Sequence, residues 1–187
     1  MTMGKALSSI LAGVLMGFVT SGNLTAQVPP EELLLLQPSV FFGQQVAGAG
    51  SEAYIQQIGS LNEVELMQLN DPGGRGHLAK VLQSGQMNLA IITQNGQENK
   101  LTLLQRGDQN TYELINTGQA NDLVTFQDGS GNRIVQQLLE SNQMQVEFIQ
   151  IGNNNEILSA LQGMQQSGLI IRQTGDGLRA IVNRMSQ

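Results

Sequence analysis

Cysteine and tryptophan are absent from this chain of 187 residues, which holds only two Tyr, five Phe and one His. The lack of cysteine excludes disulfides, thiolate metal sites and a lipid-modified cysteine. With so few aromatic side chains to bury, stability must come from another source, and repeated backbone pairing is the obvious one. The single histidine, His77, is too few for a His-type metal site, and it occupies a slot of the repeat described below. We therefore expect a structural protein without catalytic residues, cofactor or metal.

Charged residues make up only 13% of the chain, the formal net charge is −6, and Lys and Arg form no basic patch. Binding to nucleic acid relies on clustered Lys and Arg that neutralise phosphates. We therefore expect no nucleic acid partner.

The first 26 residues have the layout of a secretory signal peptide. Lys5 precedes an apolar run at 10–19, and small residues then lead to Ala26. A membrane anchor is the alternative, but the apolar run is short for a span and contains Gly13 and Gly17. We predict cleavage after Ala26 and a secreted, extracellular mature chain.

From residue 51 onward the chain repeats one short pattern, seen whole in "QSGQMNLAIITQ" (83–94). Its Asn position recurs in eleven units, mostly spaced by 11 residues. Nine of the eleven units have Gly three residues before this position, and eight have a side-chain amide six residues after it. A fixed period of this kind indicates a repeat architecture.

Polar and apolar positions alternate within each unit. In "NKLTLLQ" (99–105) the first, third, fifth and seventh residues share one face, while Lys100, Thr102 and Leu104 share the other. A period of two predicts a β-strand, and regularly recurring Gly would be costly in helices. The intervening "Q-x-G-x-x-N" predicts a tight turn, because Gly tolerates positive φ and Asn can also visit it.

Two units would form one lap of about 22 residues, and successive laps would stack at about 4.8 Å. The predicted fold is therefore all-β: an amyloid-like β-solenoid of strand–turn units, two units per lap, with five and a half laps. Its inward face would hold small apolar residues between two sheets about 10 Å apart.

Asn and Gln recur at the edges of the inward face, where each would lie over its copy in the next lap. Side-chain amides can bond to the copies above and below, whereas a buried amide without a partner costs about 1–3 kcal/mol. The predicted stacking ladder comprises Asn62, Gln68, Gln83, Asn88, Gln94, Asn99, Gln105, Asn110, Asn121, Gln127, Asn132, Gln150, Asn155 and Gln173. The predicted turn glycines are Gly59, Gly85, Gly96, Gly107, Gly118, Gly129, Gly152 and Gly175.

Changes in unit length must fall in turns, because a slip of one residue would turn a strand inside out. The long insertion "LNDPGGRG" (69–76) meets this requirement with its Gly and Pro content. We place two single-residue insertions outside the strands as well, near Leu139 and near Gln162.

The pattern Gln-x-Gly-x-x-Asn-x-Ala-x-x-x-Gln resembles the repeat of the curlin family. Residues 83–94 match it at every fixed position, and the units with Val64 and Leu101 match it except at Ala. The resemblance covers 51–187 and is most specific over 83–127. It implies a β-solenoid subunit of curli, the amyloid fibres (fimbriae) of the bacterial biofilm matrix that serve adhesion. It also implies a homologous curlin subunit and the curli secretion machinery as partners.

The sequence shows no polar cap at the start of the repeats, since Tyr54–Gly59 is already repeat-like. Open ends that match the interior predict self-assembly end to end. A secreted solenoid adhesin or binding module that stays monomeric is the alternative.

The family has a major fibre subunit and a minor, nucleating subunit. Units from Met144 onward are degraded, and Arg184 stands in the last unit where Gln would stack. This resembles the basic final repeat of the nucleator and favours the minor role, with the major role as alternative. The Arg-containing last repeat is also a candidate for association with the cell surface. Residues 27–50 are interpreted either as a secretion address or as a strand or short helix that covers the first lap.

Overall fold

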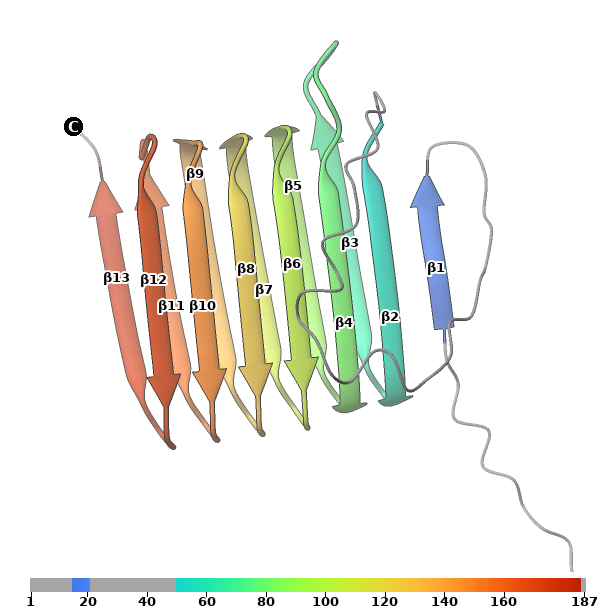
Figure 1. Cartoon of the computed structure of the whole chain (residues 1–187), viewed down its shortest axis with the longest axis vertical. Helices are drawn as coiled ribbons and strands as arrows, with labels where there is room; N and C mark the ends of the chain where they lie inside the picture. Colours follow the sequence, from blue (N-terminus) through green and yellow to red (C-terminus); the bar gives the residue numbers. More distant parts are fainter. Residues whose placement is uncertain (1–14, 21–49, 186–187) are drawn as a thin grey trace, which may run out of the picture.

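The computed structural model of the chain describes residues 15–20 and 50–185, which contain strands and turns and no helix (Figure 1). The strands are β1 (Leu15–Thr20), β2 (Glu52–Ser60), β3 (Glu63–Asn70), β4 (Leu78–Gln86), β5 (Leu89–Gln97), β6 (Lys100–Arg106), β7 (Thr111–Gln119), β8 (Asp122–Asp128), β9 (Arg133–Asn142), β10 (Gln145–Ile151), β11 (Glu156–Gln162), β12 (Gly168–Thr174) and β13 (Arg179–Met185).

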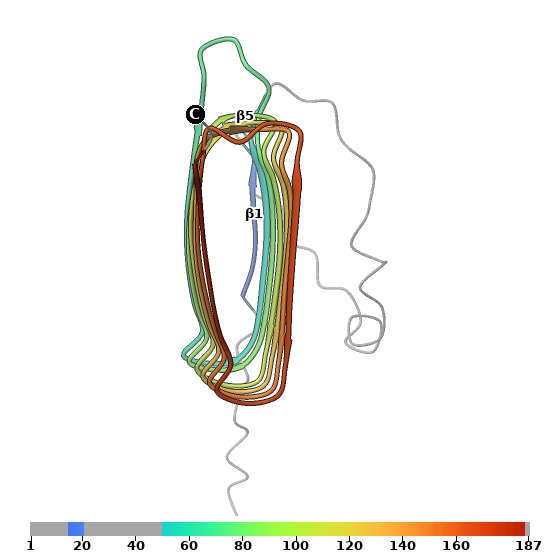
Figure 2. The same cartoon turned by 90° about the vertical axis from the view of Figure 1, so that its left-hand side faces the viewer.

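The strands after β1 alternate between two parallel sheets. Sheet A has the order β2-β4-β6-β8-β10-β12, and sheet B has the order β3-β5-β7-β9-β11-β13. Seen along the solenoid axis, the laps superpose as nested flat rings whose two long walls are the two sheets (Figure 2). The prediction of an all-β solenoid with two strands per lap is confirmed.

The solenoid has six laps, half a lap more than predicted. The additional strand is β2, which pairs in parallel with β4 and places Gln57 opposite Gln83. This half-lap is not apparent from the repeat pattern because Ser51, not Asn, stands at the position that corresponds to His77. Gln57 itself follows the repeat, since it precedes Gly59 by two residues.

Because successive side chains of a strand point to opposite faces of the sheet, every second side chain of each sheet points into the core. Leu101, Tyr112 and Phe148 are fully buried there, so the expectation of only small apolar residues is wrong. Large and small residues follow each other along the axis: Ala90 lies directly beside Tyr112 in sheet B. This spacing lets bulky side chains fill a narrow core, and burial raises the pKa of Tyr112.

The two edges of the solenoid differ. At the edge where sheet A leads into sheet B, the Gln position of the repeat always precedes the next Asn position by five residues, and we call it the regular edge. At the opposite edge, where sheet B leads into sheet A, lie the insertion 69–76 and both single-residue insertions; we call it the variable edge (Figure 1). The insertion 69–76 projects beyond the other turns, as Figure 2 shows.

The single-residue insertion near Leu139 lies inside the bounds of β9, so its predicted place outside the strands is wrong. Between β7 and β9 the register is Asn116 with Leu138 and then Gly118 with Ser141, which leaves one extra residue in a β-bulge. Glu140 absorbs it with a φ of 54°. The insertion near Gln162 follows at the end of β11, where the N–H of Gly163 donates to the carbonyl of Leu139 at 3.0 Å. The bulge therefore propagates from one lap to the next.

The edge of β2 that the sequence predicts to be open is paired in the full chain. Residues 15–20 form β1, which pairs antiparallel with residues 52–57. The predicted signal peptide (1–26) lies outside the described residues except for β1. The segment 27–50 lies outside them except for Gly50. No helix in the described part of the chain is long and apolar enough to span a membrane.

Candidate functional site in the ladders and ends of the solenoid

The regular edge carries an unbroken column of glutamines, one from each strand of sheet A. The Nε2 of each donates to the Oε1 of the next at 2.7–3.0 Å, through six residues in sequence: Gln57, Gln83, Gln105, Gln127, Gln150 and Gln173. All the bonds run the same way, from the lap nearer the N-terminus to the lap nearer the C-terminus. The column therefore has a polarity.

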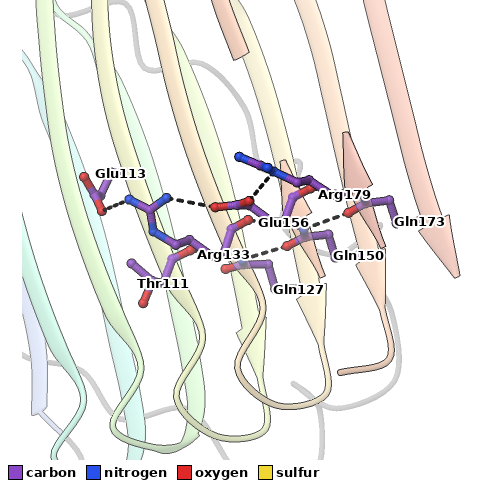
Figure 3. Close-up of polar contacts among 8 residues, drawn as sticks. All are labelled: Thr111, Glu113, Gln127, Arg133, Gln150, Glu156, Gln173 and Arg179. Atoms are coloured by element: carbon purple, nitrogen blue, oxygen red, sulfur yellow. Dashed lines mark hydrogen bonds and ion pairs between the residues drawn. The ribbon is translucent and has the colours of Figure 1, made fainter. Parts of the chain in front are cut away.

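The second N–H of the glutamine amide crosses to the other sheet. Gln127 Nε2 donates to the carbonyl oxygen of Thr111 at 3.0 Å, and Gln150 Nε2 to that of Arg133 at 3.2 Å (Figure 3). Both donors of each central glutamine are thus used, and its oxygen accepts from the preceding lap. The amides can be fully buried because their hydrogen bonds are made, and they join sheet A to sheet B.

The regular edge also carries an unbroken column of asparagines at the start of the sheet B strands: Asn62, Asn88, Asn110, Asn132 and Asn155. The Oδ1 of Asn110 accepts the backbone N–H of Asn132 at 3.1 Å, and its Nδ2 donates to the carbonyl of Gly129 at 2.9 Å. Each asparagine thus ties its own lap to the backbone of the following one. The main bonds are to backbone groups, whereas the sequence analysis expected bonds between amides.

The amide column at the end of the sheet B strands breaks down. Gln68 Nε2 donates to Gln94 Oε1 at 2.9 Å, but the next residue in the column is Asn116, whose side chain is one methylene shorter. The Nε2 of Gln94 and the Nδ2 of Asn116 are buried without a hydrogen-bond partner among the described residues. Leu138 and Leu161 then continue the column as apolar residues.

The asparagine column at the start of the sheet A strands contains only Asn99 and Asn121. In the preceding lap this position is His77. Its Nδ1 accepts the backbone N–H of Asn99 at 3.3 Å, and its Nε2 lies 3.0 Å from the Leu69 carbonyl. His77 thereby takes over the acceptor role of an asparagine. Below Asn121 lies the buried Met144, which supplies no amide.

Glycine is required at the turn positions because the backbone of the next lap approaches closely and because φ is positive there. Gly107 has a φ of 94°, and a Cβ on it would overlap the backbone carbonyl of Gly129 in the next lap. The same relationship links each predicted turn glycine except the last to the following lap. The expectation that the ladder asparagines adopt positive φ is wrong. The residue immediately before each does so instead, for example Gln109 with a φ of 59°.

Sequence reasoning did not find a charged column on the outer face of sheet B. Arg133 bridges Glu113 at 3.1 Å and Glu156 at 3.3 Å, and Arg179 reaches Glu156 at 2.8 Å (Figure 3). The signal is present in the repeat register, because Arg133, Glu156 and Arg179 each directly follow the Asn position of their unit.

The two ends of the solenoid leave the interior rows incompletely covered. The inward-facing Val64 and Leu66 of the first lap and Ala180 and Val182 of the last lap are only partly buried. Seven of the eleven exposed large apolar side chains of the described part belong to these two laps: Leu61, Met67, Leu69, Ile170, Leu178, Ile181 and Met185. The two end laps therefore leave more apolar surface exposed than the laps between them.

No family model, curated protein or solved structure matches the chain. Within the described residues, no three His, Cys, Asp or Glu side chains gather closely enough to hold a metal ion. The arrangement that distinguishes this molecule is its repeated hydrogen bonding along one axis, which is open at the last lap and is covered by β1 at β2 of the first lap.

Proposed function

We propose that the protein is a structural subunit of an extracellular amyloid fibre that resembles curli, and that it assembles by adding laps end to end. The observation that carries this proposal is the unbroken glutamine column, which reaches the first and the last strand of sheet A. An end of such a column presents the same groups that every interior lap already satisfies. A second molecule can therefore continue it.

The charge of the last lap supports the minor, nucleating role within such a fibre. Arg172, Arg179 and Arg184 are all exposed, and Arg184 ends the sheet B column of Gln68 and Gln94. A cation in place of an amide makes this end unlike an interior lap. Under the same proposal the Arg-containing last lap that remains exposed at the end of a fibre contacts the cell surface, and the subunit works with a homologous curlin and its secretion machinery.

The test uses residues 27–187, which contain all twelve solenoid strands and every buried core residue. Thioflavin fluorescence should rise after a lag, and the product should be fibrils with a meridional reflection near about 4.8 Å. A chain that remains a folded monomer under these conditions would refute fibre formation. Seeds of this protein should shorten the lag of a major curlin subunit, and seeds that leave it unchanged would refute the nucleating role.

A monomeric secreted adhesin is the second candidate, and the pairing of β1 with β2 favours it. Solenoids that remain monomeric cover their end strands, and β1 covers one of them in the full chain. The same thioflavin experiment on the full chain and on residues 27–187 separates the candidates. Monomers in both cases would favour the adhesin.

A further inference from the structure

The two ends of the solenoid carry opposite charge. Strands β2 and β3 contain three glutamates (Glu52, Glu63 and Glu65) and no cation, whereas β12 and β13 contain three arginines (Arg172, Arg179 and Arg184) and no anion. Of the four laps between them, the lap of β4 and β5 contains one cation and the lap of β10 and β11 contains two anions, while the other two mix both signs. An acidic first lap and a basic last lap are complementary between two copies of the same chain, and like ends repel.

The direction of the hydrogen bonds in the glutamine column independently favours contact between unlike ends. Among the described residues, Gln57 Oε1 accepts no hydrogen bond, whereas Gln173 Nε2 donates only one, to the Glu156 carbonyl at 3.1 Å. A free donor therefore lies at the last lap and a free acceptor at the first. Only head-to-tail contact brings them together.

We propose that the last lap of one molecule docks on the first lap of a second copy of this chain, with β12 against β2 and β13 against β3. Continuing the in-chain register by one lap sets Gln173 opposite Gln57 and Arg179 opposite Glu63 of the second copy. This inference rests on the proposed fibre function and specifies its joint.

The register matches the apolar inward rows of both sheets. Leu169 and Ile171 meet Ala53 and Ile55, and Ala180 and Val182 meet Val64 and Leu66, so each partly buried apolar side chain finds an apolar partner. On the outer face of sheet B, the sequence Arg133–Glu156–Arg179 continues with Glu63, which keeps the alternation of charge seen in Figure 3. In the full chain β1 occupies the free edge of β2, so the joint forms after β1 leaves.

The last turn glycine provides a steric test of the joint. A Cβ on Gly175 meets only Leu178 Cδ1 at 3.7 Å, because no lap follows in the same molecule. In the proposed joint it would overlap the carbonyl of Gly59 of the next copy, as a Cβ on each of the other predicted turn glycines overlaps the carbonyl of the following lap. Gly177, in the same turn, has nothing within 4 Å of an added Cβ and occupies a position where interior laps carry Leu61 or Met87.

The charge experiment uses residues 27–187 as wild type, Arg179→Glu, Glu63→Arg, and an equimolar mixture of the two variants. Each variant alone places like charges at every joint and should lengthen the lag about threefold to tenfold. A fibre in which the two variants alternate has opposite charges at every joint, so the mixture should return the lag to that of wild type. Arg106→Glu, which makes the same charge change in a middle lap, is the control for net charge.

The steric experiment compares Gly175→Ala with Gly177→Ala. Both variants place alanine at a positive φ, 124° at Gly175 and 67° at Gly177, so circular dichroism first checks that each monomer folds. Only Gly175→Ala should then block elongation on wild-type seeds. Register is then read from fibres of Ile181→Cys/Glu65→Cys, which should oxidise to covalent multimers, since opposed strand residues lie within disulfide reach. Ile181→Cys/Met67→Cys, shifted by two residues, should oxidise far less.

The outcomes separate the two proposals. If wild type forms no fibres, the proposed function and the joint both fall. If wild type forms fibres but the single charge variants match it, the mixture gives no rescue, or the shifted cysteine pair oxidises equally well, the fibre stands and this joint is wrong. Fibres that elongate only with a different subunit would replace the second copy by that partner.

Discussion

Gln105 lies directly over Gln127, and its Nε2 donates to the Oε1 of Gln127 at 2.8 Å although 22 residues separate them in sequence. Gln105 also accepts from Gln83 at 2.8 Å and donates to the Leu89 carbonyl of sheet B at 3.1 Å. One buried side chain therefore joins three laps and two sheets. The energetic importance of the repeat should be concentrated in such residues.

Shortening this side chain should destabilise the solenoid. Gln105→Asn removes one methylene, so the amide can no longer reach both neighbours in the column. The Nε2 of Gln83 and the Oε1 of Gln127 would then each lose a partner while buried, which should lower the free energy of unfolding by about 1–3 kcal/mol. Urea unfolding of the monomer measures the change.

The reverse change should be stabilising in the other amide column. Asn116→Gln adds the missing methylene beside Gln94, whose Nε2 is buried without a partner among the described residues. The restored bond should raise the free energy of unfolding by about 1 kcal/mol, less whatever is lost from the 3.0 Å bond between Asn121 Nδ2 and Asn116 Oδ1. An equal loss of stability in both variants would mean that the columns contribute no specific hydrogen bonding.

Interior and exterior pairs on one strand should differ in their effect on assembly. Asn99 and Gln105 of the β6 unit are fully buried, whereas Lys100 and Thr102 are partly exposed on the outer face. Asn99→Ala with Gln105→Ala should slow thioflavin-detected assembly much more than Lys100→Ala with Thr102→Ala. Equal lag times for the two double variants would contradict a role for the interior amides.

Turn glycines should divide into two classes. Gly107→Ala places a Cβ at a φ of 94° against the Gly129 carbonyl, so strain and overlap add and the loss should reach about 3 kcal/mol or more. Gly177→Ala meets open space at a φ of 67° and should cost about 1 kcal/mol. Thermal unfolding of both variants, with wild type alongside, tests whether the neighbouring lap sets the requirement for glycine.

The sequence was sufficient to predict the solenoid, because strand alternation and turn chemistry recur in phase and each unit repeats the same information. It was not sufficient where a different residue performs the same task. The first half-lap was not recognised because Ser51 stands at the Asn position. His77 accepts a hydrogen bond through a ring nitrogen, where the repeat would use an amide oxygen. The left-handed residue before each asparagine could not be predicted either, since Gln109 and Met87 have no intrinsic preference for it.

The difference between the two edges also escaped sequence reasoning. It becomes visible only when units are assigned to alternate sheets, which places every length change on the variable edge and the two longest amide columns on the regular edge. A bulge such as that at Glu140 needs a partner strand to be recognised, because it is defined by the residue it fails to pair with. The regular edge therefore keeps a constant spacing and carries the longest hydrogen-bonded columns, and the variable edge tolerates insertions.

Replacing Leu178 of the last lap should strengthen the proposed joint. It occupies the position that follows Asn155 in the asparagine column, is exposed, and donates its backbone N–H to Asn155 Oδ1 at 2.9 Å. In Leu178→Asn, the new Oδ1 could accept the N–H of Asn62 of the next copy, and the new Nδ2 could donate to its Gly59 carbonyl, as Asn110 does within the chain. Two added bonds should lower the critical concentration for assembly about tenfold or more.

Sedimentation of the unassembled fraction at equilibrium measures this critical concentration, with Leu178→Gln as the control because its longer side chain fits the column poorly. A critical concentration that does not fall in Leu178→Asn would mean that residue 178 does not face Asn62 of a second molecule.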